Sequence, residues 1–269
     1  MKLSIITVCY NAPNLKETCE SIINQKCQDF EWIVIDGGSN NETQKIWDKY
    51  KKRIDIFVSE KDSGIYNAMN KGICLAKGEY LLFMNAGDAF YDENSVINFI
   101  NSGLTAPVIY GNSVYFDPEK NKSYRISYPK KINKVFWIND CICHQATFIK
   151  AELFKKFGLY LETYKSASDF EKWLCFYKNK VKFEKLNQWI SVFYLGGFSN
   201  KALEISNKER SMIEKKYFSE KEIKNNKGKR VYYKILERFF SIKNSLDKKK
   251  KIITILNIHI TIPYKRKEK

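Results

Sequence analysis

The chain has 269 residues, enough for one large domain or for a domain with an extension. With 44% hydrophobic and 15% aromatic residues it can form a sizeable core, and global disorder is excluded. Residues 201–269 carry 21 Lys and Arg against 8 Asp and Glu, so they hold +13 of the net charge of +17. We therefore expect one domain over residues 1–200 and a basic C-terminal extension over residues 201–269 that meets an anionic partner.

The first half of the chain alternates strands with helices. Apolar and β-branched runs predict strands at 3–10, 32–35, 54–58 and 80–84. Apolar residues at helical spacing predict helices at 15–23, 43–50 and 65–76. This order predicts an α/β fold with a doubly wound, mostly parallel sheet and right-handed crossovers.

Two acidic residues follow strands of this sheet. The apolar run 80–84 suits a strand buried on both faces, and it stops at Asn85-Ala86-Gly87-Asp88. Asp88 is thus expected at the carboxyl end of a central strand, where a carboxylate can hold a divalent cation and, through it, phosphate oxygens. Asp36 ends the second strand and could accept hydrogen bonds from a nucleoside. The pattern leaves open that Asp88 only caps the next helix and that Asp36 is only a turn residue.

The second half is less regular. Short strands are expected on either side of Gly111-Asn112, and a mobile, acceptor-facing loop is expected at 124–137. Further strands are expected at 142–149, which contains His144-Gln145, and at 189–194, with helices at 152–157 and after Asp169. In the tail, residues 203–246 are expected to be largely helical, and the alternating segment 252–263 is consistent with a short hairpin.

The cysteines and the N-terminus bear on the compartment. Seven cysteines at irregular spacing indicate a reducing environment, and Met1-Lys2 leads directly into a strand without a cleavage site, so we expect a cytoplasmic protein. Cys141-x-Cys143-His144 is similar to a fragment of a metal site, but with no second pair nearby, two buried thiols are the favoured interpretation. No apolar stretch reaches the ~18 residues that a membrane span needs.

Taken together, these residues resemble the inverting family-two glycosyltransferases with the GT-A fold, over about residues 1–200. Four segments carry the resemblance: the opening strand 4–11, the strand end 34–39 (V-I-D-G-G-S), the run 62–72 (D-S-G-I-Y-N-A-M-N-K-G), and 78–88. The resemblance implies a reaction that moves a hexose from a nucleotide-sugar to a hydroxyl with inversion. Its expected acceptor is a saccharide or a lipid-linked saccharide, in the synthesis of a bacterial surface polysaccharide, lipooligosaccharide or capsule.

The resemblance also assigns residues to the donor. Asp36 matches the aspartate that contacts the base or ribose, and Asp88 is the carboxylate left of a D-x-D element that binds a divalent cation, Mn²⁺ or Mg²⁺. The run 62–72 matches a family segment reading A-R-N-x-G, in which Met69 replaces the arginine. Donor-binding residues assigned in this way are Asp36, Asp62, Asn70, Lys71 and Asn85.

Two further residues are assigned to the chemistry. Asp169, in Ala167-Ser168-Asp169, matches the family's catalytic base at a helix start, and it would take the proton of the attacking hydroxyl. An aspartate at that position is otherwise usually a cap. His144 is assigned to the metal site with Asp88, because His144-Gln145 is similar to an H-Q element of one bacterial subgroup. A lone histidine in a strand is otherwise often a satisfied core residue.

Two other functions compete with this hypothesis. The charge of +17 suggests a nucleic-acid-binding protein, but it is concentrated in the tail while carboxylates line the sheet edge, so we expect no nucleic-acid partner. A nucleotidyltransferase also places carboxylates at strand ends, but Asn11-Ala12-Pro13-Asn14 is not a glycine-rich phosphate loop.

The tail suggests a membrane surface as the anionic partner. Lys248 to Lys251, Phe239-Phe240 and the segment 252–263 combine charge with apolar residues that could rest in a bilayer interface. We therefore expect peripheral association with the inner face of the cell membrane. The alternative is a solvated helical extension that packs on the catalytic domain.

Overall fold

The structure, a computed structural model, describes residues 1–12, 14–196, 203–229, 240–244, 250–255 and 258–263. This chain divides into two compact units. The first comprises Met1–Ile132 and Cys141–Phe218, and the second Asn133–Asp140 and Ser219–Lys269. The first unit therefore continues past the boundary near Asn200 that the charge distribution predicted.

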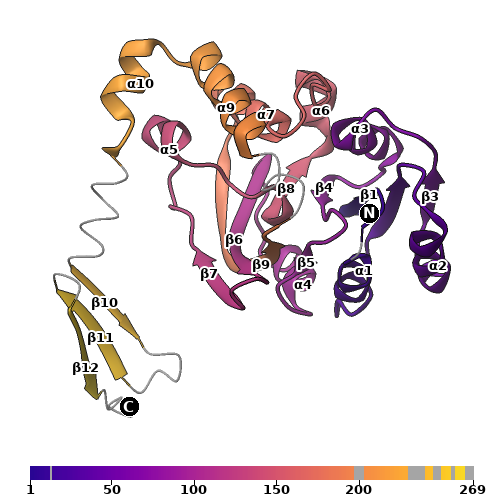
Figure 1. Ribbon diagram of the computed structural model, residues 1–269, viewed down its shortest axis with the longest axis horizontal. Coiled ribbons are helices and arrows are strands. Elements are labelled where there is room, and N and C mark those ends of the chain that lie inside the picture. The colour runs from indigo at the N-terminus through magenta and orange to yellow at the C-terminus, as the bar shows by residue number, and fades with distance from the viewer. Residues whose placement is uncertain (13, 197–202, 230–239, 245–249, 256–257, 264–269) are drawn as a thin grey trace. The chain divides into compact units, whose positions relative to one another are not determined.

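A nine-stranded sheet forms the centre of the first unit (Figure 1). Its order is β3-β2-β1-β4-β8-β6-β9-β5, with β7 paired to β6. The strands are β1 (Leu3–Cys9), β2 (Glu31–Asp36), β3 (Ile56–Ser59), β4 (Tyr80–Phe83), β5 (Ala89–Phe90), β6 (Val108–Asp117), β7 (Lys122–Ile126), β8 (Thr147–Lys150) and β9 (Phe183–Tyr194). Strands β3, β2, β1 and β4 are parallel neighbours, and β6 runs parallel to β9, whereas β5, β7 and β8 pair antiparallel. The predicted mostly parallel α/β sheet is confirmed.

Helices cover both faces of this sheet. They are α1 (Leu15–Ile23), α2 (Asn41–Tyr50), α3 (Ile65–Leu75), α4 (Ser95–Ile100), α6 (Ala151–Phe157), α7 (Ser168–Lys178) and α9 (Leu203–Tyr217). Helix α3 packs on β1 and β2, whereas α1 packs on β5 and α4 on β9, so α1 and α4 lie on the face opposite α3 and α6 (Figure 1). Gly72 lets α3 approach the sheet closely, because an added Cβ would lie 2.4 Å from Ile6 Cγ2.

The core is built from fully buried aromatic and aliphatic side chains. Phe99 of α4 stacks on Phe148 of β8 with ring centroids 3.8 Å apart, and Trp32 packs edge-on against Trp47. Strands β1, β2 and β4 are buried at every position, as expected for central strands covered on both faces. This rigid centre fixes the positions of the loops at the strands' carboxyl ends.

Three predictions for the second half need correction. The segments on either side of Gly111 form one continuous strand, β6, and Gly111 does not form a turn. The glycine makes room for Ile190 of β9, because an added Cβ would lie 2.3 Å from Ile190 Cγ1. His144 lies in a 3₁₀ turn, η1 (His144–Ala146), before β8, because the N–H of Ala146 and the hydroxyl of Thr147 both donate to the Cys143 carbonyl. The segment 124–137 is a loop only in its middle: residues 124–126 are the end of β7, and residues 134–137 are the start of helix α5 (Lys134–Asn139), which Asn133 caps.

The second unit contains α5, α10 (Glu220–Asn226) and a three-stranded sheet of β10 (Phe240–Asn244), β11 (Lys250–Ile255) and β12 (Ile258–Pro263). Lys134 Nζ lies 2.5 Å from Glu222 Oε1 and joins α5 to α10. The predicted hairpin is confirmed in the antiparallel pairing of β11 with β12. The expected helix over 203–246 is found as α9 and α10, but residues 240–244 form a strand; residues 230–239 and 245–246 lie outside the described residues. Within the described residues, no helix combines the length and apolarity needed to cross a membrane.

Candidate active site

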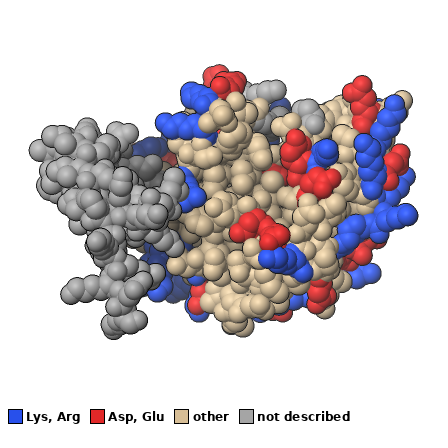
Figure 2. All heavy atoms as spheres, turned by 90° about the horizontal axis from the view of Figure 1, so that it is seen from below, with Lys and Arg blue, Asp and Glu red and all other residues tan. Residues whose placement is uncertain are grey.

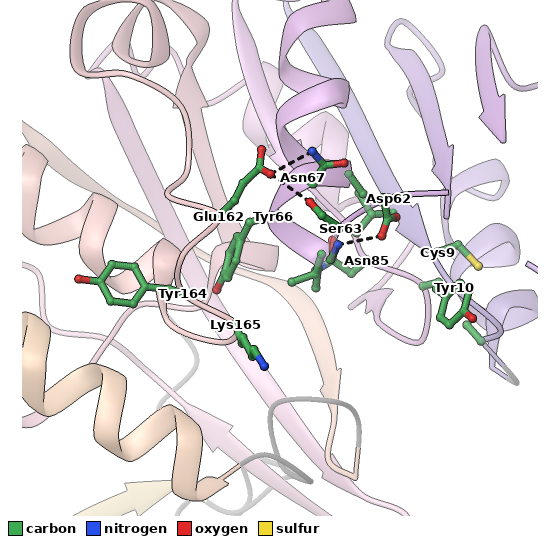
Figure 3. Close-up of a pocket in the computed structure, with 16 residues that line it drawn as sticks. Cys9, Tyr10, Asp62, Ser63, Tyr66, Asn67, Asn85, Glu162, Tyr164 and Lys165 are labelled. Atoms are coloured by element: carbon green, nitrogen blue, oxygen red, sulfur yellow. Dashed lines mark hydrogen bonds between the residues drawn. The ribbon is translucent and has the colours of Figure 1, made fainter. Parts of the chain in front are cut away.

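A pocket of about 400 Å³ opens at the carboxyl edge of the sheet in the first unit (Figure 3). Four segments form its wall: the end of β1, the loop and first turns of α3, the residues after β4, and the loop before α7. The lining residues are 8–10, 12, 62–68, 85–86, 162 and 164–165. Its position follows from the fold, because the carboxyl ends of parallel strands meet at one edge and their loops surround a crevice.

A chain of hydrogen bonds links two walls of this pocket through Asp169. The Tyr66 hydroxyl donates to Asp169 Oδ1 at 3.1 Å, and His144 Nδ1 lies 3.2 Å from Asp169 Oδ2. His144 Nε2 in turn lies 3.1 Å from Asn85 Nδ2. Because Asn85 Nδ2 can only donate, Nε2 of His144 is the acceptor of this bond and Nδ1 carries the proton that faces Asp169. Tyr66 and Asn85 line the pocket, and Asp169 and His144 lie between them.

Asp169 is held as a carboxylate at this position. Burial raises its pKa, but the hydrogen bond and charge of His144, the Phe170 N–H and the Tyr66 hydroxyl together bring the pKa below its ordinary value. Its side chain is 18% exposed, so a small group can still reach it. Burial keeps the pKa of Tyr66 well above its ordinary value, so this phenol remains a donor. A reachable, ionised carboxylate with an oriented histidine is an arrangement suited to accepting a proton.

Asp88 is not among the residues that line this pocket. Gln145 donates to its Oδ2 at 2.6 Å and the Tyr194 N–H to its Oδ1 at 3.4 Å, and the residue is only 7% exposed. Burial raises the pKa of Asp88 to about 6, although Gln145, His144 and the Tyr194 N–H lower it in part. The carboxylate assigned to a metal therefore has protein partners on both oxygens.

Asp36 is also buried. Its Oδ2 accepts hydrogen bonds from the Ser39 N–H, Ser59 and Gln44, whereas its Oδ1 is buried with no hydrogen-bond partner among the described residues. Burial raises its pKa, but these donors outweigh burial and lower the pKa below its ordinary value. Asp36 is thus an ionised carboxylate with one unpartnered oxygen, but it is 0% exposed and lies outside the pocket lining.

Asp62 connects the end of β2 with the pocket wall. Its Oδ1 accepts the Gly64 N–H at 3.0 Å, and a Cβ added to Gly37 would lie 2.5 Å from its Oδ2. Gly37 thus makes room for a side chain that lines the pocket.

Asn70 and Lys71 have structural partners instead. Asn70 exchanges hydrogen bonds with the Tyr160 backbone and donates to Glu162, which ties α3 to the loop before α7. Lys71 pairs with Glu60 at 2.6 Å. Of the predicted donor residues in the described chain, only Asp62 and Asn85 belong to the pocket lining.

Several pocket residues carried no sequence signal strong enough to single them out. Tyr10, at the end of β1, is 66% exposed, and Tyr66 lies inside the run 62–72 without having been assigned. Glu162 accepts hydrogen bonds from Ser63 and Asn67, which Figure 3 shows across the pocket rim. Glu162 and Lys165 come from an irregular loop, where period and spacing predict nothing.

The cysteines next to His144 are protonated thiols. Burial raises the pKa of Cys143 to about 12 and raises that of Cys141 further. Across the described ranges, no group of three or more His, Cys, Asp or Glu side chains is placed to hold a metal ion. None of the seven cysteines, all of which lie in the described ranges, forms a disulfide bond. On the face in Figure 2, acidic and basic side chains of the described residues lie interspersed.

The sequence and the fold are similar to those of known glycosyltransferases. The model of glycosyl transferase family 2 matches residues 4–158. A PGL/p-HBAD biosynthesis glycosyltransferase of Mycobacterium bovis is 29% identical over 206 residues, covering 73% of this chain and 78% of that protein. An uncharacterized glycosyltransferase of Methanocaldococcus jannaschii is 27% identical over 206 residues, covering 70% of this chain and 69% of that protein.

Two solved structures share the fold. S. aureus TarS in complex with UDP-GlcNAc gives a TM-score of 0.61 at 17% identity, covering 73% of this chain and 59% of that chain. The mannosyltransferase PcManGT from Pyrobaculum calidifontis, in complex with GDP-Man and Mn²⁺, gives 0.60 at 15% identity, covering 78% of this chain and 61% of that chain.

The fold is that of the GT-A glycosyltransferases. The chain belongs to glycosyl transferase family 2.

Proposed function

We propose that the protein transfers a hexose from a nucleotide-sugar to a hydroxyl group with inversion, and that Asp169 is the general base. The observation that carries this proposal is the hydrogen-bonded chain from Tyr66 through Asp169 and His144 to Asn85 at the pocket wall. An ionised Asp169 accepts the proton of the attacking hydroxyl, and His144 holds its other oxygen in place. A single displacement at the anomeric carbon needs such a base and no nucleophilic side chain, and it inverts the centre.

The pocket supports a nucleotide-sugar as the donor. Tyr10 offers an exposed aromatic face at its rim, and the N-terminus of α3 and Lys165 contribute positive potential for a diphosphate. Asp36, with its unpartnered Oδ1, is proposed to accept a hydrogen bond from the nucleoside. The two relatives of similar fold are described with UDP-GlcNAc and GDP-Man.

A divalent cation belongs to the proposal because the Pyrobaculum relative is described with Mn²⁺. When bound, it would neutralise the charge that grows on the leaving diphosphate. The side chains fit this group only in part. Asn85 Oδ1 is a buried oxygen without a hydrogen-bond partner in the described chain, but Asp88 and His144 are engaged by Gln145 and Asp169. No step is therefore assigned to a metal, and the metal roles of Asp88 and His144 stay predictions.

The acceptor is proposed to be a saccharide or a lipid-linked saccharide of a bacterial surface polysaccharide, lipooligosaccharide or capsule. The mycobacterial relative is named for PGL/p-HBAD biosynthesis. Peripheral binding to the inner face of the cell membrane would bring the enzyme to such an acceptor. Membrane binding is proposed because the tail is strongly basic. Each Lys or Arg near an anionic leaflet contributes about 1 kcal/mol to the free energy of binding.

The reaction is tested by incubating the full chain with UDP- and GDP-sugars, with and without Mn²⁺, and a panel of saccharide acceptors. The product is characterised by the proton coupling constant at its new anomeric carbon. Inverted configuration relative to the donor supports the proposal, and a retained configuration contradicts it. Turnover of nucleoside triphosphates without turnover of any nucleotide-sugar would favour a nucleotidyltransferase instead.

Membrane binding is tested by flotation of the full chain with vesicles of anionic lipid at low and high salt. Replacing the four lysines at positions 248–251 by Gln should weaken flotation. The matched control changes the same number of exposed lysines on and after α2, namely Lys45, Lys49, Lys51 and Lys52. Equal flotation of both variants, or binding that does not depend on salt concentration, would contradict this part of the proposal.

A further inference from the structure

Helix α9 is tied to the start of α7 by a buried carboxylate. Glu209 is 9% exposed, and its two oxygens accept three backbone N–H groups, from Lys165 at 2.7 Å, Ser166 at 2.9 Å and Ala167 at 3.0 Å. These amides belong to the last residues of the loop that lines the pocket and lead directly into Ser168-Asp169. One side chain from a distant segment thus holds the backbone immediately before Asp169.

The start of α7 has no cap of its own. The residue at the cap position is Ala167, which has no side-chain acceptor, whereas most helices begin with Ser, Thr, Asp or Asn. Glu209 instead accepts the N–H of Ala167 and of the two residues before it, and its negative charge near the N-terminus of α7 is favourable to the helix dipole.

Three further contacts hold α9 against α7. The guanidinium of Arg210 lies 4.1 Å from the ring centroid of Phe170, the residue after Asp169. At the next residue of α7, Glu171 is 3% exposed and its Oε1 accepts hydrogen bonds from Lys216 Nζ at 2.7 Å and from the Tyr217 hydroxyl at 2.5 Å. The contacts to Glu171 fix the body of the helix, whereas Glu209 fixes the backbone that leads into Asp169.

We propose that Glu209 is a positioning residue for the reaction: by holding the amides of residues 165–167, it keeps Asp169 within hydrogen-bond distance of His144 and Tyr66. This inference rests on the proposed role of Asp169 as the base. It makes α9 part of the catalytic machinery although α9 contributes no residue to the pocket lining of the described chain. A shift of about 1 Å in a catalytic group can cost about 10²-fold in rate, so a tether at this point has a large effect.

The test compares four full-length variants. Glu209→Gln keeps the shape of the side chain but replaces one carboxylate oxygen by an amide that cannot accept. Glu209→Asp keeps the charge and shortens the reach. Glu204→Gln makes the same chemical change at an exposed position of the same helix and is the matched control. Asp169→Asn reports on the base itself.

Glu209→Gln should lower kcat by about 10- to 100-fold while KM for the nucleotide-sugar and the affinity for UDP or GDP change less than twofold. The acidic limb of its kcat–pH profile should move to higher pH, because Asp169 loses the contacts that lower its pKa. Deuterium exchange at amides 165–167 should accelerate, and Glu204→Gln should match wild type in all of these measurements. If Glu209→Gln fails to fold, Glu209→Asp is expected to fold and to show the same result, a lowered kcat with a nearly unchanged KM.

Suppose that Asp169→Asn is inactive while a folded Glu209→Gln or Glu209→Asp keeps the wild-type kcat and pH profile. This result would overturn the positioning role of Glu209 and leave Asp169 as the base. Loss of turnover in Glu209→Gln with full turnover in Asp169→Asn would also overturn it, because the tether would then act through another residue. That second outcome refutes the proposed base as well.

Discussion

His144 Nδ1 lies 3.2 Å from Asp169 Oδ2, and the two side chains are 15% and 18% exposed. They come from η1 and from the first turn of α7. In the chain, these two elements are separated by residues 147–167, which form a strand, a helix and a loop. The metal ligation suggested for His144 by its sequence stays a prediction. In this geometry the histidine orients the carboxylate and favours its charged form.

Asp169→Asn should lower turnover by about 10²- to 10⁴-fold, because the amide keeps the shape of the side chain but cannot take the proton. Donor affinity should barely change. Initial rates and calorimetry with the nucleotide-sugar measure the two effects, with Asp48→Asn on the exposed face of α2 as the control. A comparable loss in Glu162→Gln without one in Asp169→Asn would identify Glu162 as the base.

His144→Gln should lower turnover by about 10- to 100-fold, the effect of removing one hydrogen bond to a charged group. Asp169 has its pKa lowered by His144, so the variant should raise that pKa. The carboxylate would then be protonated at a higher pH, and the acidic limb of the kcat–pH profile should move upward in pH. A pH profile that keeps its position would mean that His144 does not act on Asp169.

Asp88 makes a prediction about stability. Its pKa is raised from 3.8 to about 6 in the folded protein, so its stabilising effect is full below pH 3.8 and is lost as the pH rises through about 6. Asp88→Asn cannot ionise. The free energy of unfolding of wild type should therefore fall relative to that of the variant by about 1–3 kcal/mol between about pH 4 and 7. Parallel pH curves from denaturant titrations would contradict the buried, raised carboxyl.

Asp36 is tested with nucleotide alone. If its unpartnered Oδ1 accepts a nucleoside hydroxyl, Asp36→Ala should weaken UDP or GDP binding by about 1–3 kcal/mol. Calorimetry on the variant, with the exposed Asp29→Asn as control, measures this change. Because three donors would also lose their acceptor, thermal melting should first establish that the variant is folded. Equal affinity in a folded variant would remove Asp36 from the donor site.

Apolar runs were sufficient to predict the parallel strands β1 to β4 and most of the helices, but not β5 or β7. Buried strands such as β1 and β4 are marked by unbroken β-branched and apolar residues, and helices such as α1 and α3 by apolar positions at helical spacing. The same reasoning failed at Gly111, where a glycine that looks like a turn is a contact with Ile190. A glycine's partner across a sheet has no trace in the neighbouring sequence.

The sequence by itself also determined that Asp36, Asn85 and Asp88 follow strands, and it singled out His144 and Asp169 as candidates. Only the tertiary structure decided which of them meet. It pairs His144 with Asp169, turns Asp88 toward Gln145, and brings Glu209 of α9 to the amides before α7. Spacing along the chain specifies local geometry, but contacts between distant segments depend on how whole elements pack, and the direction of a carboxylate is set by the donors that this packing delivers.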